Sequence, residues 1–89
     1  MVFEFDPDKS ASNRLKHGID FTEAQELWLV GAAVVRSDRC DETRYARIAR
    51  HRDGNLWTAI YTHRGTNIRI ISVRKASRSD RQLYEENIS

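Results

Sequence analysis

Hydrophobic residues recur every three or four positions up to about residue 31 and alternate with polar ones after it. The first spacing is typical of amphipathic helices and the second of strands. Asp6-Pro7 predicts the start of a helix and Gly18 its end, with Ala11 and Leu15 as the buried stripe. The rotation of 100° per residue puts the remaining polar side chains on the opposite, exposed side: Lys9, Asn13, Lys16 and His17.

Two further helices are predicted. Asp20 and Glu23 have the spacing of a capping box, which predicts a second helix that ends between 29 and 31. Near the end of the chain, Ser77 with Asp80 three residues later can cap a last helix. The apolar face of the second helix would consist of Phe21, Ala24, Leu27 and Trp28.

Five segments have the composition of strands. Asp53-Gly54 and Arg64-Gly65 predict tight turns between the last three of them, and a polar loop over 37–43 contains Cys40. The last strand is expected to be central because its apolar residues point to both faces. The predicted strands are Val2–Phe5, Ala32–Arg36, Arg44–His51, Leu56–Thr62 and Ile68–Val73.

These elements predict one α+β domain over residues 1–89. Short connections favour an antiparallel sheet of about four strands, to which the short N-terminal strand is added. The two N-terminal helices would cover one face, a C-terminal helix would follow, and the second face could remain open. The lone Cys40 makes no internal disulfide or cysteine-based zinc site, so we expect a cytoplasmic protein.

The net charge of +2 hides an uneven distribution. Residues 1–43 carry five Lys/Arg and nine Asp/Glu, whereas residues 44–89 carry ten and four. Twelve of the basic residues are Arg, whose planar fork binds phosphate through two hydrogen bonds. This basic half favours RNA or DNA as a partner, and ordinary solubility and salt bridges are the alternative.

Arg69 is the most informative basic residue because it lies between Ile68 and Ile70 in the most hydrophobic strand. A charge there is costly unless it lines a site or is paired, and Glu23 or Glu26 could be the buried partner. The three histidines lack the paired spacing of metal ligands, so we expect no metal and no cofactor. Strand alternation divides 44–51 into one face with Arg44, Ala46, Ile48 and Arg50, and another with Tyr45, Arg47, Ala49 and His51.

Four segments resemble the BrnT toxins of bacterial type II toxin–antitoxin systems. They are FEFDPDKSASNRLKHG (3–18), FTEA (21–24), TRYARIA (43–49) and YTHRGTNIRIISVRKASRSDRQLYE (61–85). The patterns DPxKxxxNxxKHG and RIISxRKA are the most specific, and they occur in the expected order. The chain departs from the family where His63 replaces a frequent Glu and Asp80 a common Glu.

The resemblance implies a RelE-like fold and RNA cleavage that inhibits translation. It also implies a cognate BrnA-like antitoxin of the ribbon-helix-helix class, which forms a hetero-oligomer with the toxin and links it to operator DNA. We therefore expect a protein of the bacterial cytoplasm with no membrane partner. The family's recurrent polar residues fall on Lys9, Asn13, Lys16, His17, Arg44, Arg69, Ser72, Arg74 and Lys75.

A metal-independent endoribonuclease needs a base for the 2′-hydroxyl, cations for the phosphate and an acid for the 5′ oxygen. We expect Arg69 and Arg74 to stabilise the charge. Candidates for proton transfer are His17, Lys16 and His63, and a helix cap is the alternative role for His17. Candidates for RNA binding are Arg44, Arg47, Lys75, Tyr61 and Tyr84, with core packing as the alternative for Tyr61. The alternative functions are a single-stranded nucleic-acid-binding module that does not cut and a protein-interaction module.

Overall fold

The sheet has five strands in the order β1-β5-β4-β3-β2, and the computed structural model describes residues 1–37 and 42–88. The strands β2 to β5 form the predicted antiparallel meander, whereas β1 pairs with β5 in parallel, so the sheet is mixed. The middle strand is β4, which corrects the prediction that the last strand is central. The bounds are β1 Phe3–Glu4, β2 Ala32–Ser37, β3 Arg44–Arg50, β4 Leu56–Arg64 and β5 Asn67–Lys75.

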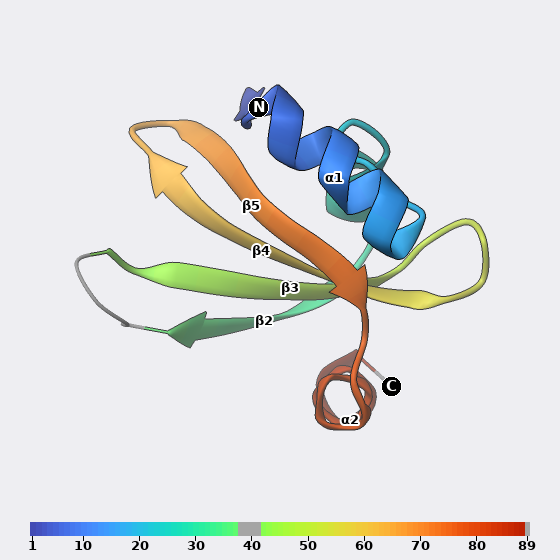
Figure 1. The fold of residues 1–89 in the computed structure, drawn as a ribbon. Coiled ribbons are helices and arrows are strands. Elements are labelled where there is room, and N and C mark those ends of the chain that lie inside the picture. Colours follow the sequence, from blue (N-terminus) through green and yellow to red (C-terminus); the bar gives the residue numbers. More distant parts are fainter. Residues whose placement is uncertain (38–41, 89) are drawn as a thin grey trace.

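Three helical elements flank the sheet: α1 (Pro7–His17), the 3₁₀ helix η1 (Glu23–Trp28) and α2 (Arg78–Ile88). Figure 1 shows α1 beside β5 and α2 on the far side of the sheet, near β2 and β3. None of the described helices is long and apolar enough to cross a membrane. Residues 38–41, and with them the part of the predicted loop that contains Cys40, lie outside the described residues.

The helix α1 has the predicted bounds but not the predicted buried face. Asp6 accepts a hydrogen bond from the Asp8 N–H at 2.9 Å, and Gly18 ends the helix at φ 85°. Ala11 and Leu15 face solvent, and Leu15 is 90% exposed. The helix packs instead through two polar residues, because hydrogen bonds to buried backbone groups compensate for their burial.

Ser10 and Asn13 make those hydrogen bonds. The Ser10 Oγ accepts one from the Phe21 N–H at 2.9 Å. Asn13 donates from Nδ2 to the Ile19 carbonyl at 2.9 Å, and its Oδ1 accepts from the Val73 N–H at 3.2 Å. Since β1 pairs only with Ile68 and Arg69, Asn13 satisfies a backbone donor farther along β5.

The second predicted helix is present, but it is a 3₁₀ helix rather than an α-helix. Thr22 occupies the cap position and makes no side-chain cap hydrogen bond, whereas the Asp20 Oδ1 accepts from the Glu23 N–H at 2.8 Å, which is one of the two contacts of the predicted capping box. A six-residue segment completes only two 3₁₀ turns, and short stretches favour this tighter winding. Its buried side chains and those just before it pack with residues of β3, β4 and β5 into the main core: Ile19, Phe21, Ala24, Leu27, Ala49, Trp57, Ala59, Tyr61, Ile68, Ile70 and Val73.

A register shift interrupts the pairing of β4 with β5. Ile60 pairs with Ser72 and Tyr61 with Ile70, so Ile71 is the extra residue of a bulge. Residues on the two sides of a bulge exchange the faces that strict alternation would give them. As a result Arg69 and Arg74, five residues apart, both lie on the face opposite the main core.

Candidate active site

The sheet face opposite α1 and η1 presents rows of side chains across the strands. Cross-strand partners share a face, so the register gives each row directly. An outer row contains Thr62 and Arg69, and continuing the register places Arg44 opposite Thr62. The middle row is mainly apolar: Val35, Ala46, Ile60 and Ser72. The other outer row consists of Ala33, Ile48, Thr58 and Arg74, and its first three members are buried.

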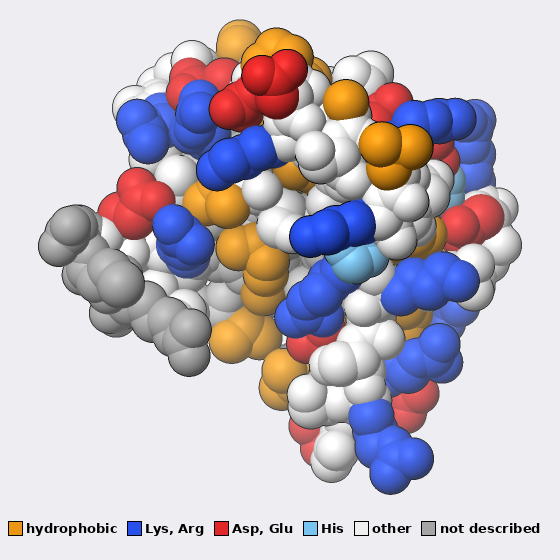
Figure 2. Space-filling view, in the orientation of Figure 1, with side chains coloured by type: hydrophobic (Ala, Val, Ile, Leu, Met, Phe, Trp, Pro, Cys, Tyr) orange, Lys and Arg blue, Asp and Glu red, His pale blue; other side chains and the backbone are white. Residues whose placement is uncertain are grey.

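The uncovered part of this face contains a hollow of about 380 Å³. Arg44 and Arg74 line it together with apolar side chains of the middle row. Figure 2 shows an apolar band of the surface, in orange, with Lys and Arg side chains, in blue, on both sides of it. Below we call it the cationic groove, with the lining residues Val35, Ser37, Arg44, Tyr45, Ala46, Ile60 and Arg74. Such a groove combines charges for phosphates with apolar surface for bases or riboses.

Arg74 is held at the edge of the groove by a carboxylate from α2. Its Nη1 donates to Oδ2 of Asp80, and the side chains are 40% and 12% exposed, respectively. The same oxygen accepts from the Thr58 hydroxyl at 3.0 Å and from the Ser77 N–H at 3.0 Å. Although burial raises the pKa of Asp80, these hydrogen bonds outweigh it and hold that pKa below its ordinary value.

Arg69 pairs with Glu4 of β1 rather than with Glu23 or Glu26. Its Nη1 lies 3.3 Å from Oε1 of Glu4, and both side chains are 35% exposed. The predicted ion pair therefore exists with a different partner and is not fully buried. Arg69 lies opposite Thr62 and Arg74 opposite Thr58, so their Cα atoms are about 13 Å apart along the sheet. Each guanidinium is held by a carboxylate from a different element, Glu4 of β1 for Arg69 and Asp80 of α2 for Arg74.

Lys16 and His17 are exposed and lie in the last turn of α1. Asn13, one turn earlier, bonds to Val73, which precedes Arg74 in β5. Figure 1 accordingly shows the C-terminal ends of α1 and β5 at the same end of the fold. Both residues therefore lie at the same end of the fold as Arg74, on a helix that packs on the other face of the sheet from the groove.

His63 lies at the other end of the fold. Its exposed ring meets the rings of Tyr45 and Tyr61 edge to face at centroid distances of 5.1 and 5.8 Å. It alternates with Thr62 and so points to the face that carries the core. His63 and His17 are thus separated by the length of β5.

The remaining predicted RNA-binding residues do not line the groove. The Arg47 guanidinium donates to the Leu27 and Val30 carbonyls at 2.9 and 3.0 Å, which explains its place beneath η1. Tyr61 is 5% exposed and packs in the core, and burial raises the pKa of its phenol. Lys75 and Tyr84 take part in cation–π contacts instead. The Lys75 ammonium lies 6.0 Å from the centre of the Trp57 ring, and the Arg50 guanidinium lies 5.9 Å from the centre of the Tyr84 ring.

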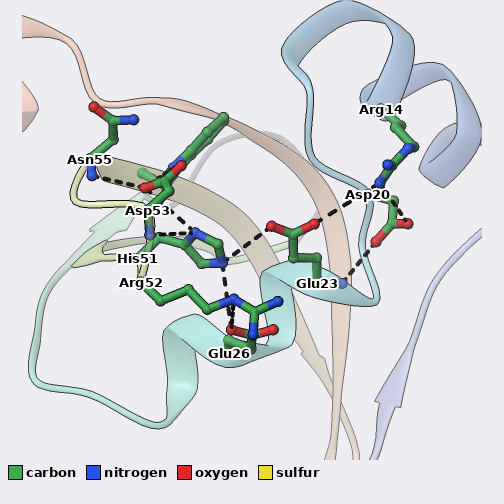
Figure 3. Close-up of polar contacts among 9 residues, drawn as sticks. Arg14, Asp20, Glu23, Glu26, His51, Arg52, Asp53 and Asn55 are labelled. Carbon is green, nitrogen blue, oxygen red and sulfur yellow. Dashed lines mark hydrogen bonds and ion pairs between the residues drawn. The ribbon is translucent and has the colours of Figure 1, made fainter.

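A second polar cluster surrounds His51, on the core side of the sheet (Figure 3). Its Nδ1 accepts from the Asp53 N–H at 3.3 Å, so Nε2 carries the proton. This buried Nε2 lies 3.3 Å from Oε2 of Glu23 and 3.6 Å from Oε1 of Glu26, without an aligned hydrogen bond among the described residues. Arg52 pairs with Glu26 at 3.3 Å. The cluster ties η1 to the β3–β4 hairpin, and no described group of His, Cys, Asp and Glu is arranged to hold a metal.

The sequence analysis named Arg44, Arg69 and Arg74 but not the carboxylates that pair with them: Glu42 for Arg44 at 3.5 Å, Glu4 for Arg69 and Asp80 for Arg74. The capping-box spacing of Ser77 and Asp80 indicated a helix start, and nothing in it indicated that the same carboxylate also binds Arg74. Glu4 carried no signal, because its pairing with Arg69 depends on the parallel contact of β1 and β5.

Comparison with known proteins identifies the fold and the family. The crystal structure of the ribonuclease toxin BrnT of Brucella abortus is similar with a TM-score of 0.67, over 88% of this chain and 100% of that one. The identity is 23%, so this likeness concerns the fold. No curated protein sequence matches the chain. The family model described as "Ribonuclease toxin, BrnT, of type II toxin-antitoxin system" matches residues 5–80. The chain therefore belongs to the BrnT family of ribonuclease toxins.

Proposed function

We propose that this protein is a metal-independent endoribonuclease that cuts single-stranded RNA in the cationic groove and thereby inhibits translation. The observation that carries the proposal is that Arg44 and Arg74 line one apolar hollow, while Arg69 lies farther along the same sheet face. Family membership supplies the RNA target and an antitoxin partner. A RelE-like fold is part of the same proposal.

The scissile phosphate is assigned to the Arg74 end of the groove. There the guanidinium stabilises the extra negative charge that develops when the 2′-hydroxyl attacks the phosphate. Arg44 and Arg69 bind flanking phosphates, since both lie on the opposite row of the groove face. This division follows from the distance of about 13 Å between the Cα atoms of Arg69 and Arg74 along the sheet.

His17 is the proposed proton-transfer group, because it is exposed and lies at the same end of the fold as Arg74, from where RNA that passes the end of β5 could reach it. Lys16 beside it adds positive charge for the phosphate. His63 points to the other face of the sheet at the other end of the fold, so we assign it no step in the reaction. A 2′-hydroxyl as nucleophile restricts the reaction to RNA.

The antitoxin is proposed to be a ribbon-helix-helix protein that covers the groove and links the complex to operator DNA. The groove is basic, so its contact segment should carry acidic side chains. Blocking the face that holds Arg74 would be sufficient to silence the toxin.

The test is cleavage of one single-stranded RNA by the purified protein with EDTA present, and of a DNA strand of the same sequence as control. We expect RNA products that end in 2′,3′-cyclic phosphate or its hydrolysed form, and intact DNA. Arg74→Ala should slow cleavage by about 10²-fold, as loss of one transition-state donor does. A strict requirement for added Mg²⁺ or Mn²⁺ would overturn the mechanism. Salt-dependent RNA binding without cleavage would favour the binding module instead.

A further inference from the structure

We propose that Asp80 is a positioning residue for Arg74, so that the first turn of α2 sets the direction of the guanidinium at the groove. Its consequence for cleavage rests on the proposed function, but the contact itself does not. Asp80 is placed in α2, whereas Arg74 is near the end of β5. The direction of the Arg74 guanidinium therefore depends on where α2 packs against the sheet.

Besides Arg74, two hydrogen-bond donors hold the Asp80 carboxylate, and a third hydrogen bond holds the Asp80 backbone. Its Oδ2 accepts hydrogen bonds from the fully buried Thr58 of β4 and from the Ser77 N–H, each at 3.0 Å. The Ser77 Oγ accepts in return from the Asp80 N–H at 3.1 Å. These contacts leave the carboxylate one position, from which it holds Nη1 of Arg74.

A fixed guanidinium matters because a long side chain loses conformational freedom whenever it binds. A donor that already points at the developing charge needs no reorganisation during the reaction. Glu4 offers Arg69 a weaker hold, because it is 35% exposed and lies in a two-residue strand. Arg44 pairs with Glu42 at 3.5 Å, where the carboxylate is 37% exposed, so Arg74 is the arginine of this face whose direction the fold determines most firmly.

A double-mutant cycle tests the proposal. Asp80→Asn keeps the size of the side chain and removes its charge, so we expect kcat to fall about 10-fold with KM within about 3-fold. In an Arg74→Ala background the same change should have no further effect on kcat, because the side chain that Asp80 positions is then absent. An equal loss of kcat in both backgrounds, or wild-type kcat in Asp80→Asn, would overturn the proposal.

Asp53→Asn is the matched control. Asp53 also accepts hydrogen bonds, from the Asn55 N–H at 2.8 Å and the Trp57 indole at 3.1 Å, but it belongs to the β3–β4 hairpin. Its loss should lower the melting temperature and leave kcat unchanged. If Asp80→Asn does not fold, Asp80→Glu takes its place in the cycle, and its effect must vanish in the Arg74→Ala background.

A second measurement separates this proposal from the proposed function. The Arg74 Nη–H signals in a ¹⁵N NMR spectrum should be protected from solvent exchange in the wild type, because Nη1 donates to Asp80, and should lose that protection in Asp80→Asn. Absence of cleavage by the wild type would refute the proposed function and leave this readout intact. An Arg74 signal that is the same in both proteins would refute the positioning role, whatever the activity.

Discussion

Replacing Arg69 by alanine separates a phosphate-binding role from a structural one. A fully buried ion pair that loses one partner costs about 3–5 kcal/mol, because the other charge is left unpaired. The pair of Arg69 with Glu4 is 35% exposed on both sides, and water can solvate the carboxylate that remains. The expected loss in the free energy of unfolding is therefore about 1 kcal/mol or less.

The effect on cleavage should be larger and should appear in KM. The Cα atoms of Arg69 and Arg74 are about 13 Å apart along the sheet. Since the reacting phosphate is assigned to Arg74, Arg69 is expected to bind a neighbouring phosphate that does not react. Losing one hydrogen bond to a charged group costs about 1.5 kcal/mol, which corresponds to roughly a 10-fold rise in KM. Since ground state and transition state lose the same contact, kcat should stay within about 3-fold.

The assay combines urea unfolding with steady-state cleavage of a short RNA by the wild type, Arg69→Ala and Glu4→Gln. Glu4→Gln removes the ion pair but keeps the arginine, so its KM should remain near the wild-type value. A loss of stability above about 3 kcal/mol in Arg69→Ala would show that the pair is structural after all. A fall in kcat of about 10²-fold at unchanged KM would refute the assignment of the reacting phosphate to Arg74.

Three further predictions concern stability and the partner. Asn13→Ala should lower the free energy of unfolding by about 2–5 kcal/mol, because it leaves two buried backbone groups unpaired. Leu15→Ala, at an exposed position, should change it by less than about 0.5 kcal/mol, and denaturant melts of both variants measure the difference. The pKa of Asp80 is lowered in the fold, so the stability that its ionised carboxylate contributes is complete above the ordinary value of 3.8 and is lost as the pH falls through the lowered pKa. In this acid range the free energy of unfolding should therefore fall less steeply with pH in Asp80→Asn than in the wild type. An unchanged slope would refute this. Association with the antitoxin should be faster at low salt, and an association rate independent of salt in stopped-flow mixing would contradict charge complementarity.

The sequence by itself determined the elements whose signals are local. The cap of Asp6, the ends of α1 at Pro7 and Gly18, and the hairpin at Asp53-Gly54 depend on neighbours within a few residues. The groove arginines were also found from the sequence, through the RIISxRKA pattern and the charge in a hydrophobic strand.

The tertiary structure decided which way those elements face. Helical periodicity pointed Ala11 and Leu15 inward, but Asn13 is buried because Val73 and Ile19 offer backbone groups to its amide. Such partners are far away in sequence, and periodicity counts only apolar side chains.

The candidate site shows the same limit. Strict alternation would put Arg69 and Arg74 on opposite faces, and only the bulge at Ile71 brings them to one. Their carboxylate partners, Glu4 and Asp80, come from β1 and α2, which reach the arginines through strand pairing and helix docking. A strand's register depends on the partner strand that it meets, so no pattern within 67–75 could have fixed it.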